Sequence, residues 1–236
     1  MDCLIGMQEI PSGSVDLIIC DLPYGTTANK WDSIIPLDKL WAQYKRIIKR
    51  GAPIVLFAQQ PFTTILAASN IEWLKYEWIW EKENGSNFLM AKYCPLKIHE
   101  NILVFCENKT TYNPQMRQGF KPYKCRDKGS NANYGKIKGG ALSESDGERF
   151  PVDIIAFNRD TDSWHPTQKP LALIAYLIRT YSNPGDTVLD NCMGSGTTAV
   201  AAIRTGRNWI GYEMNTEFYN RALKRIDETM RTPTLF

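Results

Sequence analysis

The sequence predicts an α/β fold in which a mainly parallel sheet is covered by helices on both faces. Short apolar runs that fit buried strands alternate along the chain with longer segments of helical periodicity. Two of these runs end in an aspartate followed by turn-forming residues, as strands do where they open into loops. A length of 236 residues fits one such core with an insertion better than two independent domains.

The first part of the chain contains four expected strands and two expected helices. Residues 15–20 form an apolar run broken only by Asp16, which indicates a buried parallel strand, and the run stops at Asp21. A helix is expected over 36–49, where apolar residues recur at three- and four-residue steps before Gly51. The other expected elements are a helix over 59–69 and strands over 53–57, 76–80 and 102–105.

The amino-acid composition changes from Glu107 to Gly140, where apolar periodicity is lost and Lys, Arg, Asn, Gly and Tyr are frequent. We expect an insertion or partly ordered region there. Periodicity then returns, and the expected elements are helices over 170–182, 197–204 and 216–230 and strands over 187–189 and 209–212. The predicted organisation is therefore one domain made of residues 1–106 and 165–236, interrupted by an insertion over 107–164.

Composition limits the classes of function. The chain is 43% hydrophobic and 22% charged, as globular proteins are, and its net charge of +3 is only a weak indication of an anionic partner. The six cysteines include no CxxC pair and there are two histidines, so no metal is expected. No basic leader or run of about 18 apolar residues is present, which predicts a cytoplasmic protein without a membrane partner.

A glycine-containing loop over residues 190–198, Asp-Asn-Cys-Met-Gly-Ser-Gly-Thr-Thr, lies between a predicted strand and a predicted helix. Its glycines allow close approach of a ligand, and helix-terminal amides and hydroxyls can bind a carboxylate. The next strand ends at Glu213, where a carboxylate suits both hydroxyls of a ribose. The loop alone is typical of an ordinary strand–helix turn, but together with Glu213 it favours a nucleoside ligand.

A second constellation is the Asp-Leu-Pro-Tyr segment at residues 21–24. The Asp21 carboxylate and the Pro23 carbonyl are two acceptors at fixed spacing, which suits the two hydrogens of an exocyclic amine. The Tyr24 ring can stack on the base that carries the amine. Such a segment alone is more typical of a turn, and the glycine loop in the same chain favours the catalytic interpretation.

The two segments together resemble the catalytic and cofactor motifs of DNA amino-methyltransferases, which modify adenine N6 or cytosine N4. The catalytic segment comes first and the cofactor loop last, which resembles the beta class of these enzymes. The resemblance spans most of the chain and includes residues 13–18, 99–105 and 165–170. It implies a Rossmann-like methyltransferase fold with circularly permuted motif order, an S-adenosylmethionine cofactor, double-stranded DNA as partner, and a prokaryotic or phage enzyme of the restriction-modification kind.

The family's roles carry over to individual residues. The resemblance implies that Asp21 and the Pro23 carbonyl accept the hydrogens of the target amine while Tyr24 stacks on the flipped base. Glu213 would bind the ribose of the cofactor, and Thr167 and Lys169 would reach its carboxylate. Asp2 would bind the adenine amine of the cofactor, and the glycine loop would surround the methionine end. The full expected cofactor-binding set is Asp2, Asp21, Thr167, Lys169, Asp190, Gly194, Ser195, Gly196, Thr197, Thr198 and Glu213.

Two positions depart from the family pattern. Leu22 stands where the family's catalytic segment usually has a proline, which loosens the loop but leaves its acceptors in place. Cys192 replaces a phenylalanine that would pack on the cofactor. His99 and Glu100 are interpreted as structural, with a role near the target base as the alternative.

The predicted insertion is strongly basic between Asn108 and Gly140, where eight Lys and Arg residues accompany a single acid, Asp127. Interleaved aromatic residues add flat surfaces for bases. We therefore expect residues 107–164 to form the target-recognition region, with a solvated surface loop as the alternative. The expected DNA-binding residues are Lys109, Arg117, Lys121, Lys124, Arg126, Lys128, Lys136 and Lys138.

Several functions remain as alternatives to adenine-N6 methylation. Cytosine-N4 methylation uses the same loop geometry, although Asp21 favours adenine because serine is commoner there in cytosine enzymes. RNA and protein-glutamine methyltransferases have the opposite order of the two loops. An inactive module that binds the cofactor and DNA is the alternative from a different class. A homodimer is compatible with the sequence.

Overall fold

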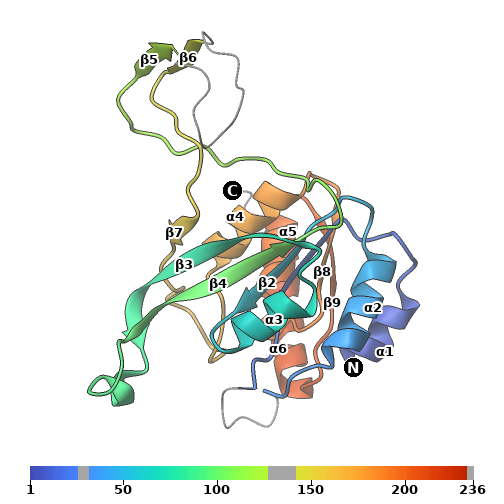
Figure 1. The fold of residues 1–236 in the computed structure, drawn as a ribbon. Coiled ribbons are helices and arrows are strands. Elements are labelled where there is room, and N and C mark those ends of the chain that lie inside the picture. The colour runs from blue at the N-terminus through green and yellow to red at the C-terminus, as the bar shows by residue number, and fades with distance from the viewer. Residues whose placement is uncertain (26–31, 127–141, 233–236) are drawn as a thin grey trace. The chain divides into compact units, whose positions relative to one another are not determined.

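The computed structural model describes residues 1–25, 32–126 and 142–232, which belong to two compact units (Figure 1). The larger unit combines Met1–Asn113 with Asp153–Phe236, and the smaller unit is Pro114–Val152. Segments from both ends of the chain thus build the larger unit, while the smaller unit is continuous in sequence.

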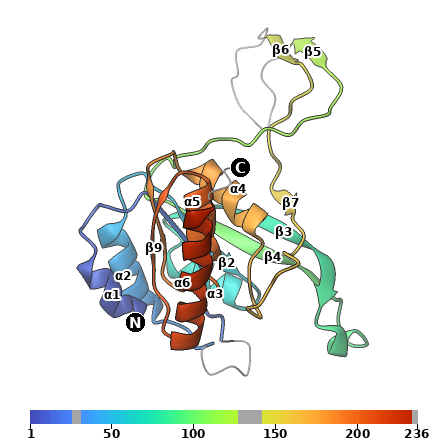
Figure 2. The same cartoon turned by 180° about the vertical axis from the view of Figure 1, so that it is seen from behind.

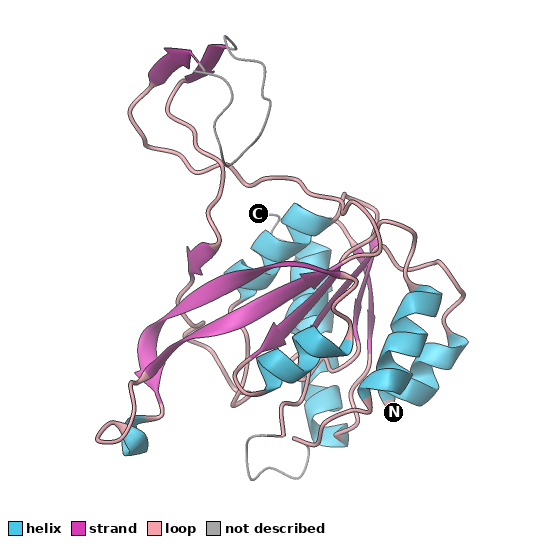
Figure 3. Ribbon diagram, in the orientation of Figure 1, coloured by secondary structure: helices cyan, strands magenta, loops and turns pink. Residues whose placement is uncertain are grey.

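A seven-stranded sheet forms the centre of the larger unit, with the strand order β7-β3-β4-β2-β1-β8-β9. Figure 3 shows strands in magenta and helices in cyan. Four pairings are parallel: β1 (Leu17–Asp21) with β2 (Ile54–Ala58) and with β8 (Thr187–Asp190), β8 with β9 (Asn208–Gly211), and β3 (Leu74–Ser86) with β7 (Ile154–Ala156). β4 (Lys97–Phe105) runs antiparallel to both of its neighbours, β2 and β3. The predicted mainly parallel α/β fold is confirmed, with one reversed strand.

Helices cover both faces of the sheet because its central strands are apolar on both sides. In β1, Ile18 and Cys20 belong to the core that includes α2 (Leu37–Ile47) and α3 (Phe62–Ser69), whereas Leu17 and Ile19 belong to the core under α4 (Leu171–Tyr181). α5 (Thr197–Arg204) packs against α4, and α6 (Thr216–Arg231) packs against α5 (Figure 2). Strands that are buried on both sides give continuous apolar runs, and the helices show apolar residues at three- and four-residue steps. Most of these strands and helices therefore agree with the expected ranges to within two residues.

The predictions were incomplete where strands leave the core. β3 and β4 are longer than the expected ranges 76–80 and 102–105, because their outer parts form an exposed hairpin that projects beyond the sheet (Figure 1). The edge strand β7 was also missed, because it has only three residues, two of them exposed, and lies within the expected insertion. The short helices α1 (Cys3–Gly6) and η1 (Met7–Glu9) were also missed. Asp2 caps α1, since its Oδ1 accepts a hydrogen bond from the Leu4 N–H at 2.7 Å.

The smaller unit contains a two-stranded antiparallel sheet of β5 (Tyr123–Arg126) and β6 (Leu142–Ser145). Arginine–aromatic contacts support it: the Arg149 guanidinium lies 4.4 Å from the Tyr123 ring centre and 5.5 Å from that of Phe120. Arg149 also donates a hydrogen bond to the Lys121 carbonyl at 2.6 Å. Cation–π and polar contacts thus stabilise a segment without apolar periodicity.

Candidate active site

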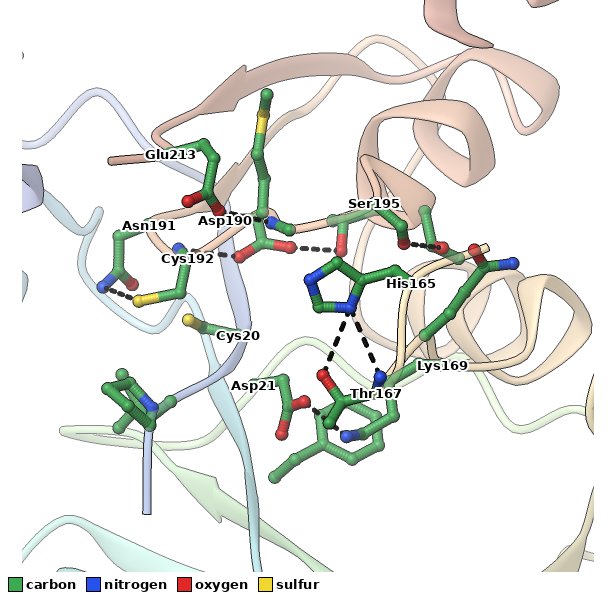
Figure 4. A pocket seen from close by; sticks show the side chains of 18 of the residues that line it. Cys20, Asp21, His165, Thr167, Lys169, Asp190, Asn191, Cys192, Ser195 and Glu213 are labelled. Carbon is green, nitrogen blue, oxygen red and sulfur yellow. Dashed lines mark hydrogen bonds and ion pairs between the residues drawn. The ribbon is translucent and has the colours of Figure 1, made fainter. Parts of the chain in front are cut away.

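A pocket of about 560 Å³ opens at the carboxyl edge of the parallel strands. β1 and β8 lie side by side there, but the chain continues from β1 towards β2 and from β8 towards β9. The loops that follow the two strands therefore diverge, which is where ligands bind in open α/β sheets. Asp21 ends β1, Asp190 ends β8 and Glu213 follows β9, and all three carboxylates line the pocket (Figure 4).

The structure brings together most of the residues predicted from the two motifs. Pro23, Tyr24 and all of the expected cofactor-binding residues except Gly196 line this pocket. Gly196 instead precedes α5 as its N-cap, with φ 73°. The two residues that depart from the family pattern, Leu22 and Cys192, also line the pocket. Within the described ranges, no group of three or more His, Cys, Asp or Glu residues is placed to hold a metal ion, and no helix is long and apolar enough to cross a membrane.

The glycine loop is held by Asp190. Its Oδ2 accepts a hydrogen bond from the Thr198 hydroxyl at 2.6 Å, and its Oδ1 accepts one from the Cys192 N–H at 3.1 Å. Burial raises the pKa of Asp190 to about 6, although these two donors favour its charged form. Gly194 has φ 46°, and a Cβ atom there would lie 3.4 Å from the His165 ring. That distance is an ordinary contact, so the positive φ, which side chains rarely adopt, is what favours glycine here.

Glu213 is fixed by backbone groups on both of its oxygens. Oε2 accepts from the Gly194 N–H at 2.9 Å, and Oε1 accepts from the Asn215 N–H at 2.8 Å. Asn215 in turn caps α6 by accepting from the N–H groups of Glu217 and Phe218. Each carboxylate oxygen can accept more than one hydrogen bond, so this geometry keeps acceptors for a ligand.

Two partners hold the Asp21 carboxylate. The Tyr24 hydroxyl donates to Oδ1 at 2.6 Å, and the Lys169 ammonium pairs with Oδ2. The Tyr24 ring stacks on Phe62, with ring centres 5.4 Å apart and an interplanar angle of 26°. The catalytic segment is thus tied to both α3 and the chain just before α4.

A row of alternating charges extends from Asp21 into the protein. Lys169 bridges Asp21 and Glu100, lying 3.3 Å from Glu100 Oε2, and Lys82 pairs with Oε1 of the same glutamate. The side chains of Lys82, Lys169 and Glu100 are only 6%, 10% and 11% exposed. Buried charges require such pairing to offset their loss of hydration.

This arrangement of charges shifts the pKa values of Asp21 and Glu100 in opposite directions. Burial raises the pKa of Asp21, with Lys169 opposing the rise and the Glu100 carboxylate adding to it. Burial also acts to raise the pKa of Glu100, but Lys169 and Lys82 together lower it. Glu100 is therefore the more firmly ionised of the two acids, and it anchors the lysine that contacts Asp21.

Sequence reasoning did not place Glu100 and Lys82 in the pocket. Glu100 was interpreted as structural, with a place near the target base as the alternative, and both residues line the pocket. Because β4 runs antiparallel to β2, Glu100 near its beginning reaches the carboxyl edge of the parallel strands. The direction of a strand is not encoded in its local apolar pattern, so the only sequence signal was the charge of Glu100 beside a buried strand.

His165 lines the pocket between the glycine loop and Thr167 (Figure 4). Its Nδ1 lies 3.3 Å from both the N–H and the hydroxyl oxygen of Thr167. Burial, together with the charges of Lys169 and Arg221, lowers the pKa of His165 to about 4. The imidazole is therefore neutral near pH 7.

The hydroxyl groups at the start of α5 are engaged with one another. Ser195 Oγ and Thr197 Oγ1 are 2.9 Å apart. Arg225 of α6 donates to Thr197 Oγ1 at 2.9 Å and to the Ser195 carbonyl at 3.2 Å. α6 thereby holds the beginning of α5 at the pocket.

The expected DNA-binding residues lie in different parts of the molecule. Lys109 belongs to the larger unit and follows the end of β4, at the sheet edge opposite the pocket. Four others lie exposed in the smaller unit, where Lys124 pairs with Glu144 at 3.1 Å and Arg117 lies over the Phe120 ring at 5.0 Å. These four are Arg117, Lys121, Lys124 and Arg126, whereas Lys128, Lys136 and Lys138 lie outside the described residues.

Sequence relatives of this chain are DNA methyltransferases. The DNA adenine methyltransferase YhdJ of Escherichia coli K12 is 29% identical over 96% of this chain and 81% of its own length. The type II methyltransferase M1.MboII of Moraxella bovis is 30% identical over 94% of this chain and 93% of its own length. Both similarities therefore extend over nearly the whole chain.

Solved structures share the fold. The M1.HpyAVI–SAM complex superposes with a TM-score of 0.65, 24% identity and coverage of 95% of this chain and 96% of its own. The cytosine-N4-specific PvuII DNA methyltransferase gives a TM-score of 0.68, 14% identity and coverage of 100% and 92%. The model of the DNA methylase family matches residues 15–224. With its two motifs in one pocket and a family match over most of its length, this chain belongs to the N6/N4 DNA methylase family.

Proposed function

We propose that this protein transfers a methyl group from S-adenosylmethionine to N6 of an adenine flipped out of double-stranded DNA. The observation that carries the proposal is the meeting of Asp21, Asp190 and Glu213 in one pocket from three neighbouring strands. Such a pocket can align a methyl donor and an amine acceptor for direct transfer.

The pocket fits the cofactor. Glu213 keeps acceptors on both oxygens for the two ribose hydroxyls, since each oxygen uses one interaction with a backbone N–H. Gly194 lines the pocket with a positive φ and no side chain, which leaves its backbone accessible to the aminoacyl end of the cofactor. When bound, S-adenosylmethionine would supply an activated methyl group that passes to a neutral amine, with S-adenosylhomocysteine leaving as a neutral thioether. Asp2 for the adenine and Thr167 for the carboxylate complete the proposed contacts.

Asp21 and the Pro23 carbonyl are proposed to accept the two hydrogens of the target amine. Accepting these hydrogen bonds increases the negative charge on the nitrogen and orients its lone pair. Tyr24 and Lys169 both bind the Asp21 carboxylate, so the acceptor is oriented before the base arrives. The amine needs no base before the transfer, and the cationic nitrogen then loses its surplus proton to water.

Lys169 has a second proposed role. The sequence resemblance assigned it to the cofactor carboxylate, while its ammonium contacts Asp21 and Glu100. We propose that Glu100 and Lys82 are positioning residues that hold Lys169 beside Asp21. A lysine in this position can keep the catalytic carboxylate ionised within a buried pocket.

DNA recognition is proposed for residues 107–164, and chiefly for the smaller unit. That unit contains eight Lys and Arg residues against four Asp and Glu residues, a larger positive excess than the net +3 of the whole chain. Such an excess suits contacts to phosphates. Arg149 and Arg117 contribute mainly to the unit's own structure, so Lys121, Lys124 and Arg126 are the proposed contacts among the described residues.

Adenine is the proposed target because an aspartate begins the catalytic segment and because the relative YhdJ is named an adenine methyltransferase. Cytosine N4 is the second candidate, since the PvuII enzyme with the same fold is named cytosine-N4-specific. The test is incubation with S-adenosylmethionine and bacteriophage genomic DNA, followed by digestion to nucleosides and mass spectrometry. We expect N6-methyladenine. Detection of N4-methylcytosine alone would reverse the assignment, and absence of both products would reject the activity on this DNA.

A further inference from the structure

The hairpin between β3 and β4 ends in an exposed apolar tip, which we define as residues 86–97 (Figure 1). Phe88, Leu89 and Tyr93 are 75%, 81% and 81% exposed, and Met90 is 46% exposed. Single exposed apolar residues are common, but several large ones grouped on a projection indicate a contact surface. Nothing in the proposed chemistry of the pocket uses these side chains.

The backbone of the tip is well defined. Asn87, with φ 70°, precedes the short helix η2 (Phe88–Met90). The Met90 carbonyl accepts from the N–H groups of Tyr93 and Cys94 at 2.8 and 3.0 Å. The Ser86 hydroxyl donates to the Lys97 carbonyl at 3.1 Å, which closes the base of the tip. Backbone groups are used within the turn, and the apolar side chains are left to solvent.

The tip rises from the rim of the active-site pocket. Ser86 at its base lines the pocket together with Lys82 and Glu100. β3 runs in the same direction as β1, because β4 is antiparallel to both β2 and β3. The hairpin therefore projects past the same sheet edge that presents Asp21, and a duplex that delivers a base to the pocket would lie beside it.

The charge of the tip favours nucleic acid over a second copy of the chain. Residues 84–98 include Lys92 and Lys97 and contain no acidic residue. Two tips that met each other would bring four lysines together, whereas a polyanion would be attracted by them. The apolar side chains and the lysines thus match a partner with both flat apolar faces and phosphates.

We propose that the tip inserts Phe88 and Leu89 into DNA next to the target base and that Lys92 and Lys97 contact the flanking phosphates. Apolar side chains that wedge between base steps hold other duplexes in a distorted form. Extrusion of a base costs its stacking energy, and such a wedge lowers that cost by replacing the lost contact. This inference rests on the proposed function, because the pocket beside the tip is the proposed place of the flipped base.

The test compares the double variant Phe88→Ala/Leu89→Ala with the control Ile71→Ala. Ile71 is also well exposed, at 64%, but it precedes β3 at the opposite edge of the sheet. KM for linear plasmid DNA, measured by transfer of tritiated methyl groups, should rise at least about tenfold in the double variant, the scale of one lost stacking contact. The dissociation constant of S-adenosylmethionine should stay unchanged, and Phe88→Trp should preserve the KM of the parent protein.

Filter binding of the same plasmid over a range of salt separates the roles within the tip. The apolar double variant should weaken binding without changing the salt slope, whereas Lys92→Ala/Lys97→Ala should reduce the slope by about one unit for each lost phosphate contact. Unchanged KM and DNA affinity in the apolar variant would overturn the proposal. So would loss of dimerisation by that variant in sedimentation, which would make the tip an interface between copies. Absence of methyl transfer by the parent protein would count against the proposed function, and filter binding would still decide the role of the tip.

Discussion

Replacement of Glu100 by glutamine should destabilise the protein although the side chain keeps its size. The change removes the negative charge shared by Lys82 and Lys169, which are buried beside it. At an effective dielectric constant of about 20, one charge 3.3 Å away contributes about 5 kcal/mol of attraction, most of which offsets the loss of hydration. Removal of one partner from a buried pair leaves the other unpaired, and we expect the free energy of unfolding to fall by about 3 kcal/mol.

Urea denaturation at pH 7 measures this loss, and Glu81→Gln provides a matched control because Glu81 is exposed on the same hairpin. The control should change the free energy of unfolding by less than about 0.5 kcal/mol. In the variant Lys169 keeps its pair with Asp21, whereas Lys82 loses its carboxylate partner. The second substitution in Glu100→Gln/Lys82→Met removes that cation, so the double variant should regain at least half of the loss. If Glu100→Gln lost no more stability than Glu81→Gln, the charge row would have no structural role.

The effect of Glu100→Gln should also depend on pH. In the folded protein, Lys169 and Lys82 lower the pKa of Glu100 below its ordinary value of 4.5, although burial acts to raise it. A carboxyl group with a lowered pKa stabilises the fold at pH values above its pKa in the unfolded chain. This contribution is lost as the pH falls through its pKa in the folded protein. The difference in stability between the parent protein and the variant should therefore be full near pH 7 and shrink below pH 4.5. A difference that stayed constant down to pH 3 would contradict ionic pairing as its cause.

Further predictions concern the chemistry and the ligands. Asp21→Ala should abolish methyl transfer but leave the S-adenosylmethionine dissociation constant within about threefold, and retention of more than about a tenth of the activity would refute the acceptor role. Tyr24→Ala should lower kcat more than Tyr24→Phe, because the phenyl ring preserves stacking and loses only the hydrogen bond to Asp21; equal losses would assign the effect to the hydroxyl alone. Glu213→Ala should weaken cofactor binding by about 1.5–3 kcal/mol in calorimetry, and an unchanged affinity would place the ribose elsewhere. Charge reversal at Lys121 and Lys124 should weaken DNA binding and flatten its salt dependence, which an unaltered salt slope would contradict.

Local patterns were sufficient where a strand is buried on both faces and ends at a residue that lines the pocket. β1 and β8 were predictable from continuous apolar runs, and Asp21 and Asp190 were found because acids interrupt these runs. Glu213 was found in the same way after β9. Such residues directly follow parallel strands, so they lie at the carboxyl edge of the sheet, where the pocket opens. Their position in the sequence was therefore enough to place them in the pocket.

Long-range contacts were beyond the reach of local patterns. The role of Lys169 depends on Glu100, which reaches it only because β4 is reversed. The outer hairpin is exposed and lacks an apolar run, so its strands were predicted too short. The smaller unit depends on guanidinium–ring contacts such as that of Arg149 with Tyr123, which have no sequence period.

The position of β1 between β2 and β8 has a consequence for synthesis of the protein. β2 follows β1 closely, but the pairs Leu17–Val188 and Ile18–Leu189 join segments from opposite ends of the chain. On the ribosome, β1 therefore exposes an unpaired apolar edge until most of the polypeptide has been made. A chain that has not yet reached β8 contains Asp21 and Tyr24 but neither Glu213 nor the glycine loop. A product terminated before β8 would thus be prone to aggregation and would lack Asp190 and Glu213, so pairing of β1 and assembly of the pocket both wait for the same late segment.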